Sequence, residues 1–184
     1  MVKEVIVKLD KMLKRLFEAS WSENYEELIK LVTGDENILI RSLDTWSKTP
    51  LHVAATMGHA KFGYELLQLN PNLTRDKNYH LSTPLHLASA KGHLEMVSIV
   101  NGKDDVFKLF INTQQLSIVS DKRGETVLYL SVNYSRFETM KLILESNIAE
   151  ELVNLKNIVV NTALHLAVEI RGLEGINLLL IIKE

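Results

Sequence analysis

One phrase occurs twice in this chain, and a shorter form of it occurs twice more. TPLHVAATMGH fills residues 49–59 and TPLHLASAKGH fills residues 83–93, while TVLYLS begins at Thr126 and TALHLA begins at Thr162. The four phrase threonines are separated by 34, 43 and 36 residues. Because the same residues favour the same local structure, this interval predicts a row of similar folded units.

Each phrase predicts the start of a helix. A threonine hydroxyl accepts a hydrogen bond from a free N–H of the first turn, and proline is tolerated next because its missing N–H would be unpaired there. Gly58 and Gly92 predict the ends of these helices, since glycine adopts a left-handed conformation without steric penalty. AKFGYELLQL and LEMVSIV follow with apolar residues three and four apart, which predicts a second helix in each unit. A two-helix unit cannot bury its own apolar face, so the units must stack.

A period near 33 residues and the phrase T-P-L-H-x-A are typical of ankyrin repeats, and the chain resembles that family. An upstream segment without the threonine, residues 16–32, aligns with residues 85–100. The resemblance implies one all-α domain over residues 1–184, an ankyrin-repeat solenoid of about five helix-turn-helix repeats with an N-terminal amphipathic helix extension. The expected bounds are 1–15 for the extension and 16–47, 48–81, 82–124, 125–160 and 161–184 for the repeats.

The phrase histidines raise the alternative of a metal or catalytic site. His52, His86 and His165 share one position in the phrase, and Tyr129 takes it in the fourth repeat. A tyrosine hydroxyl can replace a hydrogen-bonding tether, and successive phrase positions lie about 10 Å apart, too far to share a zinc ion with bonds of roughly 2 Å. As in the ankyrin family, we expect these side chains to tie each helix start to the adjacent turn, and we expect no metal or cofactor. Turn residues are expected at His59 and His93.

Composition and motifs exclude several other functions. The 184 residues include no cysteine, so there is neither a disulfide framework nor a thiolate zinc site. A net charge of -2 and basic residues spread along the chain do not favour a nucleic-acid partner. The sequence has no glycine-rich phosphate loop, no H-E-x-x-H and no G-x-S-x-G. We therefore do not expect an enzyme.

Two segments depart from the repeat pattern. The third repeat contains an insertion with NGKDD at residues 101–105, where we expect Asp104 to begin a new helical turn. The alternative there is a metal-binding acidic pair. Residues 178–182 are apolar on all sides, although a terminal repeat should present a polar face to water, so we expect this end to be uncapped.

In ankyrin proteins, the turn tips and the end of each first helix face a concave groove that binds protein partners. Carried over to this chain, the resemblance implies partner-binding residues at Trp21, Trp46, Lys48, Met57, Tyr79, His80, Lys91, Lys122, Arg123 and Tyr134. Exposed aromatic residues and methionine are common in binding hot spots, and the cations among them favour an acidic partner. The alternative for the two tryptophans is that they pack on each other or on the first turn.

The phrases LFEAS, TPLHVAA and TPLHLASAKGH also resemble plant ankyrin proteins, whose longer members add a membrane-spanning PGG-type domain. This resemblance implies a non-catalytic adaptor in plant signalling or defence, in the cytoplasm or at the cytoplasmic face of the plasma membrane. No apolar run reaches the roughly 18 residues that a membrane span needs. The alternative is a truncated cytosolic fragment of a membrane-anchored relative, without independent activity.

The N-terminal segment has an apolar stripe with basic residues on its other faces. The stripe consists of Val2, Val5, Ile6, Leu9, Met12, Leu13 and Leu16, and the basic residues are Lys3, Lys8, Lys11, Lys14 and Arg15. A signal peptide would need an unbroken apolar core, so the pattern favours a cytosolic protein. We expect a helix that continues into the first repeat and covers its open apolar side. The alternative is peripheral binding to an anionic membrane surface.

Overall fold

The structure is a computed structural model that describes residues 2–100, 120–146 and 149–181. Its helices are α1 (Val2–Ser22), α2 (Tyr25–Gly34), α3 (Ile38–Trp46), α4 (Pro50–Met57), α5 (Ala60–Leu69), the 3-10 turn η1 (Pro71–Thr74), α6 (Pro84–Lys91), α7 (Leu94–Val100), α9 (Val127–Asn133), α10 (Phe137–Leu144), α11 (Ala149–Asn154), α12 (Ala163–Glu169) and α13 (Leu173–Ile181). No strand occurs within these ranges. The helical turn predicted at Asp104 lies outside the described residues.

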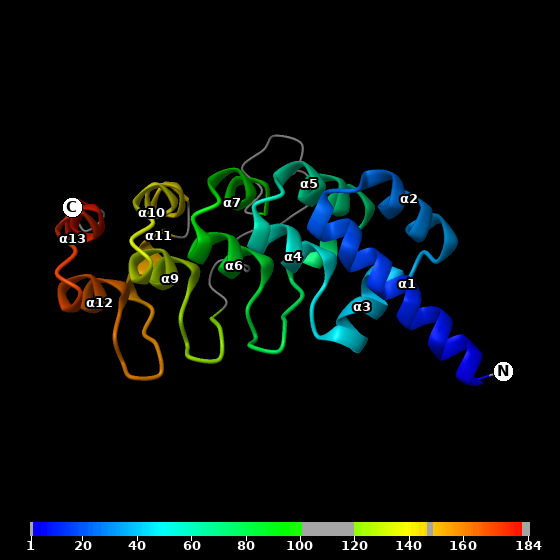
Figure 1. Cartoon of the computed structure of the whole chain (residues 1–184). Coiled ribbons are helices and arrows are strands. Elements are labelled where there is room, and N and C mark those ends of the chain that lie inside the picture. Colours follow the sequence, from blue (N-terminus) through cyan, green and yellow to red (C-terminus); the bar gives the residue numbers. More distant parts are fainter. Residues whose placement is uncertain (1, 101–119, 147–148, 182–184) are drawn as a thin grey trace.

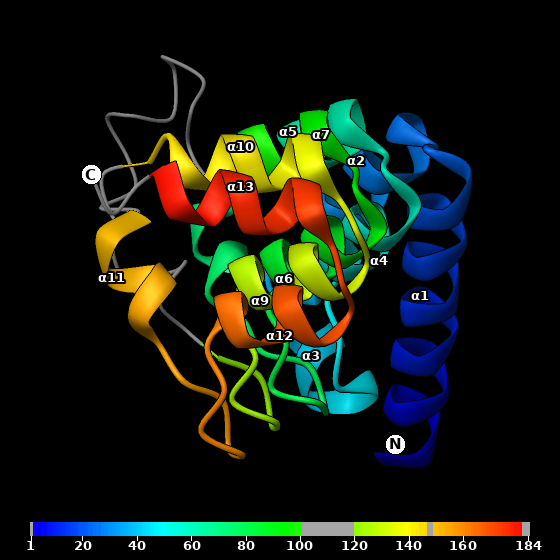
Figure 2. The ribbon, with the colours of Figure 1, turned by 90° about the vertical axis from the view of Figure 1, so that its left-hand side faces the viewer.

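Most of these helices form two parallel rows (Figures 1 and 2). The inner row consists of α1, α4, α6, α9 and α12, and the outer row consists of α2, α5, α7, α10 and α13. Each inner helix packs against the outer helix of its own pair, and neighbouring inner helices pack against each other. Helices α1 and α13 lie at opposite ends of the stack. The predicted stack of helix pairs is therefore confirmed.

The chemistry predicted for the helix ends is also present. The Thr126 hydroxyl accepts the backbone N–H of Tyr129 at 3.2 Å at the start of α9. Gly58 and Gly92 end α4 and α6 in left-handed conformations, with φ of 79° and 76°. Each phrase therefore begins its helix as its residue types predict.

Helix α1 joins the N-terminal extension to the first repeat without a break. Leu13 and Leu16 are fully buried, and Leu9 and Met12 pack against the same core. The apolar side chains at positions 5–7 are 60–67% exposed. The helix therefore covers the first repeat from Leu9 onward, as predicted, and leaves the side chains at positions 5–7 exposed.

The other end of the stack is open. Counted from the phrase threonine, Val168 and Leu180 of the last helix pair correspond to Ala55 and Leu67 of the second repeat. Val168 is 58% exposed and Leu180 is 47% exposed, whereas both counterparts are fully buried. In a repeat stack the following unit covers these positions. The expected uncapped end is thus observed as far as residue 181.

Three short loops project from the inner row and are called fingers here. They are finger 1 (residues 78–82), finger 2 (residues 121–125) and finger 3 (residues 157–161), which directly precede the inner helices α6, α9 and α12. The first side chain of each finger accepts the backbone N–H groups two and four residues further along. Neighbouring fingers are joined by backbone hydrogen bonds, from Lys122 N–H to the His80 carbonyl at 3.1 Å and from Ile158 N–H to the Arg123 carbonyl at 3.1 Å.

The fourth residue of every finger has a left-handed backbone. The φ angles are 59° at Leu81, 72° at Gly124 and 68° at Val160. Glycine takes this conformation freely, whereas a β-branched residue there is strained. Left-handed backbone at a residue with a β-carbon costs about 1–2 kcal/mol, so finger 3 is strained at Val160.

Replacing Val160 with asparagine, which tolerates the left-handed region, should raise the free energy of unfolding by about 1 kcal/mol. The valine side chain is mostly exposed, so little packing is lost. Urea denaturation of the two proteins measures the difference. Gly124→Val is the matched control, because an added β-carbon would lie 2.9 Å from the backbone nitrogen of Ile158, and we expect it to be destabilising. A less stable Val160→Asn protein would contradict the assigned strain.

Candidate partner-binding site

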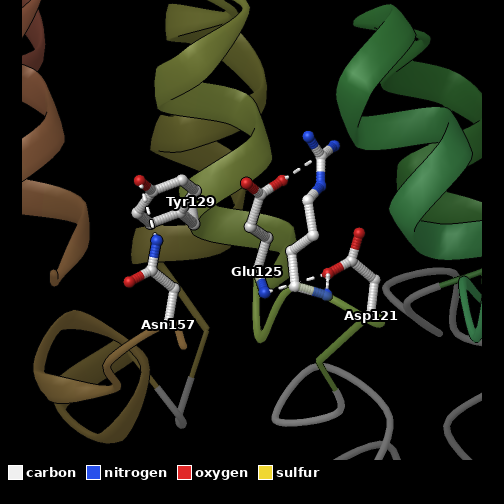
Figure 3. Close-up of polar contacts among 5 residues, drawn as sticks. Asp121, Glu125, Tyr129 and Asn157 are labelled. Carbon is white, nitrogen blue, oxygen red and sulfur yellow. Dashed lines mark hydrogen bonds and ion pairs between the residues drawn. The ribbon is translucent and has the colours of Figure 1, made fainter. Parts of the chain in front are cut away.

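The phrase histidine and its tyrosine replacement link a helix start to a finger. Nδ1 of His52 accepts the backbone N–H of Thr49 at 3.1 Å, so its proton lies on Nε2, which donates to the Ser82 carbonyl of finger 1 at 3.1 Å. In α9, the Tyr129 hydroxyl accepts a hydrogen bond from the Asn157 side-chain amide of finger 3 at 3.1 Å (Figure 3). The predicted tether is therefore present in both chemical forms.

The second histidines of the phrases link adjacent repeats. The ring of His59 donates to the Ser20 carbonyl at 3.0 Å, and the ring of His93 donates to the Thr56 carbonyl at 3.0 Å. Each histidine lies in the turn between the two helices of its own repeat, as predicted. Its ring donates a hydrogen bond to the inner helix of the preceding repeat. These contacts add a polar connection to the apolar packing of the stack.

Fingers 1 and 2, together with α6 and α9, border an open hollow of about 580 Å³. It is lined by Asn78, His80, Ser82, His86, Leu87, Ala90, Asp121, Lys122, Arg123, Leu130 and Tyr134. Four of the predicted partner-binding residues meet here, namely His80, Lys122, Arg123 and Tyr134. They come from both fingers and from the end of α9, so the stacking of the repeats brings them together.

Tyr79 connects the tips of the two fingers. The ammonium nitrogen of Lys122 lies 3.8 Å from the centroid of the Tyr79 ring, close enough for a cation–π contact. The same ring meets the ring of His80 edge-on, with centroids 4.6 Å apart. Three of the predicted residues therefore form one contact cluster beside the hollow.

Carboxylates fix the backbone and one cation of finger 2. Oδ1 of Asp121 accepts the N–H of Arg123 at 2.8 Å and that of Glu125 at 3.0 Å (Figure 3). Glu125 is buried, and its Oε2 lies 3.3 Å from the Arg123 guanidinium. Burial raises the pKa of Glu125; the Arg123 guanidinium opposes this effect, and Asp121 adds to it. Asp121 thereby fixes the backbone of Arg123, and the buried Glu125 pairs with its guanidinium.

A family model for ankyrin repeats (3 copies) matches residues 16–100 and 96–184. The chain belongs to the ankyrin-repeat family. No curated protein matches it. Ankyrin repeats indicate a protein–protein interaction module, and members of the family are typically non-catalytic. The predicted fold class, an all-α ankyrin solenoid, is confirmed.

Other predicted residues of this ankyrin protein lie outside the hollow. Trp46 is partly buried and stacks on Phe17 of α1, with ring centroids 4.7 Å apart and planes at 7°. The ammonium of Lys48 lies 5.2 Å from the centroid of the same Phe17 ring. This geometry favours the packing interpretation for Trp46, whereas Trp21 is half exposed at the end of α1.

Met57 and Lys91 extend the surface along the inner row. Counted from the phrase threonine, they occupy the same position as Tyr134 in their own repeats. All three side chains are exposed at the C-terminal ends of α4, α6 and α9. They therefore form a row that leads past the hollow.

Several residues that line the hollow or anchor its fingers were not predicted from the sequence. Leu87 and Leu130 line it from the inner helices, and Asn78 and Asp121 anchor its fingers. A signal for the anchors exists, because an asparagine or aspartate stands five residues before the phrase threonine at 78, 121 and 157. Such side chains favour turns by bonding their own backbone.

Within the described ranges, no three histidine, aspartate or glutamate side chains gather in a way that could hold a metal ion. No helix in those ranges combines the length and apolar character needed to cross a membrane.

Burial makes the His52 tether sensitive to acid. Burial lowers the pKa of His52 to about 4 from 6.5, against the opposing effect of its hydrogen bond to the Ser82 carbonyl. Between these two values the unfolded chain binds a proton that the folded protein does not. Stability is therefore full above pH 6.5 and falls as the pH drops toward 4. Asp76 acts in the opposite direction, because burial, with the nearby Asp44, raises its pKa to about 6.

Replacing His52 with glutamine, which cannot titrate, should remove this sensitivity. Relative to the variant, the wild-type protein should lose about 3 kcal/mol of unfolding free energy between about pH 7 and pH 4. Urea denaturation at several pH values measures both proteins. The contribution of Asp76 is common to both and cancels in the difference. Parallel pH profiles would show that His52 is not the responsible group.

Proposed function

We propose that this ankyrin-repeat protein binds a segment of a partner protein in the hollow between fingers 1 and 2. The observation that carries the proposal is the convergence of His80, Lys122, Arg123 and Tyr134 on one hollow. Aromatic and arginine side chains supply much of the affinity at protein interfaces. The row through Met57 and Lys91 would extend the contact toward the N-terminal repeats.

A more specific form of the proposal is a non-catalytic adaptor in plant signalling or defence. Its support is the resemblance of TPLHVAA and TPLHLASAKGH to plant ankyrin proteins. In this role the protein would hold one partner at the hollow and present it to others. The partner itself is to be identified by proximity labelling in the native tissue.

Once that partner is known, Tyr134→Ala should weaken its binding by about 2 kcal/mol, because a large exposed ring is removed from the hollow. Lys122→Glu should weaken binding by about tenfold or more, since it reverses a charge beside the hollow. Calorimetric titration measures both changes, and circular dichroism checks that the fold is intact.

Lys61→Glu is the matched control for this experiment. Lys61 is exposed on α5, in the outer row away from the fingers, so its reversal changes the net charge equally without touching the hollow. Equal affinities for the wild type and all three variants would place the partner elsewhere on the protein.

A second proposal is peripheral contact of the first turns of α1 with an anionic membrane. It is supported by the exposed apolar side chains at positions 5–7. The basic residues Lys8 and Lys11 follow them in the same helix. A helix that presents apolar and basic residues can lie in a membrane interface. The buried part of α1, from Leu9 onward, would remain with the repeats.

Two truncations separate membrane contact from capping. Deleting residues 1–7 should leave the melting temperature unchanged and abolish binding to phosphatidylserine vesicles, because the deletion removes the exposed apolar side chains of Val5, Ile6 and Val7 and spares the buried Leu13 and Leu16. Deleting residues 1–13 should also lower the melting temperature, since burial of a leucine such as Leu13 is worth about 1.5–3 kcal/mol. Co-sedimentation and thermal melts give the two readouts. Vesicle binding that survives the shorter deletion would refute the membrane contact.

A further inference from the structure

The hollow between fingers 1 and 2 has an apolar floor. Leu87 and Ala90 of α6 are half-buried, and Leu130 of α9 is buried. The volume of about 580 Å³ compares with roughly 30 Å³ for a water molecule in the liquid. It therefore has room for a large side chain, and filling it would remove apolar surface from water.

The charges exposed at the rim of this hollow are positive. Lys122 and Arg123 are both exposed, and among the described residues Lys122 contacts the Tyr79 ring and forms no ion pair. The nearby carboxylates face the protein instead. Asp121 accepts two backbone N–H groups of its own finger, and Glu125 is buried beside Arg123. A partner approaching the rim thus meets cations first.

We infer that the hollow binds an acidic peptide segment that places one apolar side chain on the floor and carboxylates at the rim. This inference rests on the proposed function. Carboxylates complement Lys122 and Arg123, and an apolar side chain complements Leu87 and Leu130. Both cations are already held, Lys122 by the Tyr79 ring and Arg123 by Glu125, so binding restricts fewer side-chain rotamers.

The apolar floor favours a peptide over a nucleic acid. Phosphates would engage the rim but leave the surface of Leu87, Ala90 and Leu130 uncovered. A nucleic-acid-binding surface also depends on many clustered cations, whereas this chain has a net charge of -2. The acidic peptide satisfies both parts of the hollow.

Selection from a displayed library of random peptides, with the whole chain as bait, tests the inference. The enriched peptides should carry aspartate or glutamate on both sides of a leucine, methionine or phenylalanine. Fluorescence anisotropy should show that Lys122→Glu weakens their binding by about tenfold or more, while Lys61→Glu leaves it unchanged. Within a peptide, replacing the apolar residue with glycine, or the acids with their amides, should each weaken binding by about tenfold.

Three results would overturn the inference. They are enrichment of peptides without acidic residues, no enrichment above that obtained with Lys122→Glu as bait, and equally tight binding of a single-stranded oligonucleotide that displaces the peptides. The proposed function fails separately, when the native partner binds the Tyr134→Ala protein as tightly as the wild type. A partner that needs Tyr134 but shows no acidic segment would defeat the inference and leave the proposed function standing.

Discussion

The packing of each inner helix against the next is the interaction on which the rest of this protein depends. Six residues after the phrase threonine stand Ala55, Ser89 and Val132, and all three are buried. Their side chains face the following repeat, so they are covered only when that repeat is in place. Small or branched side chains here allow close approach of the helices, and the helix spacing in turn sets the distance between fingers.

The spacing of the inner helices also determines how the fingers lie at the proposed binding surface. Because the Lys122 N–H donates to the His80 carbonyl, the tips of fingers 1 and 2 are held in a fixed register. That register places the Lys122 ammonium over the Tyr79 ring and the His80 side chain at the same hollow. The chemistry of the site is therefore a consequence of stacking, although none of its exposed residues contributes to the core.

The sequence predicted features whose causes are local. A threonine and a proline determine the starts of α4 and α6, and Gly58 and Gly92 determine their ends. These helix bounds could therefore be predicted without knowing any contact between repeats. Helix α3 was not predicted: the side chain of its N-cap residue, Asn37, forms no capping hydrogen bond, and the helix buries Ile38 and Leu39 in the stack. Packing of Trp46 was foreseen as an alternative, but its partner Phe17 was not identified, since the contact joins two segments that meet only after folding.

The difference between local signals and contacts between repeats also explains which part of the site could be predicted from the sequence. Residues at the finger tips could be named from their place in the repeat, but their grouping depends on contacts between repeats. At the open end, His165 keeps its bond to Thr162 yet stays exposed, whereas His52 is buried under finger 1. A phrase histidine is therefore buried only where the following repeat covers it. The hollow lies between fingers of which finger 1 bonds back to Ser47 and finger 2 bonds on to finger 3. It thus occupies the part of the solenoid where the supporting backbone is held from both directions, as a precise binding surface requires.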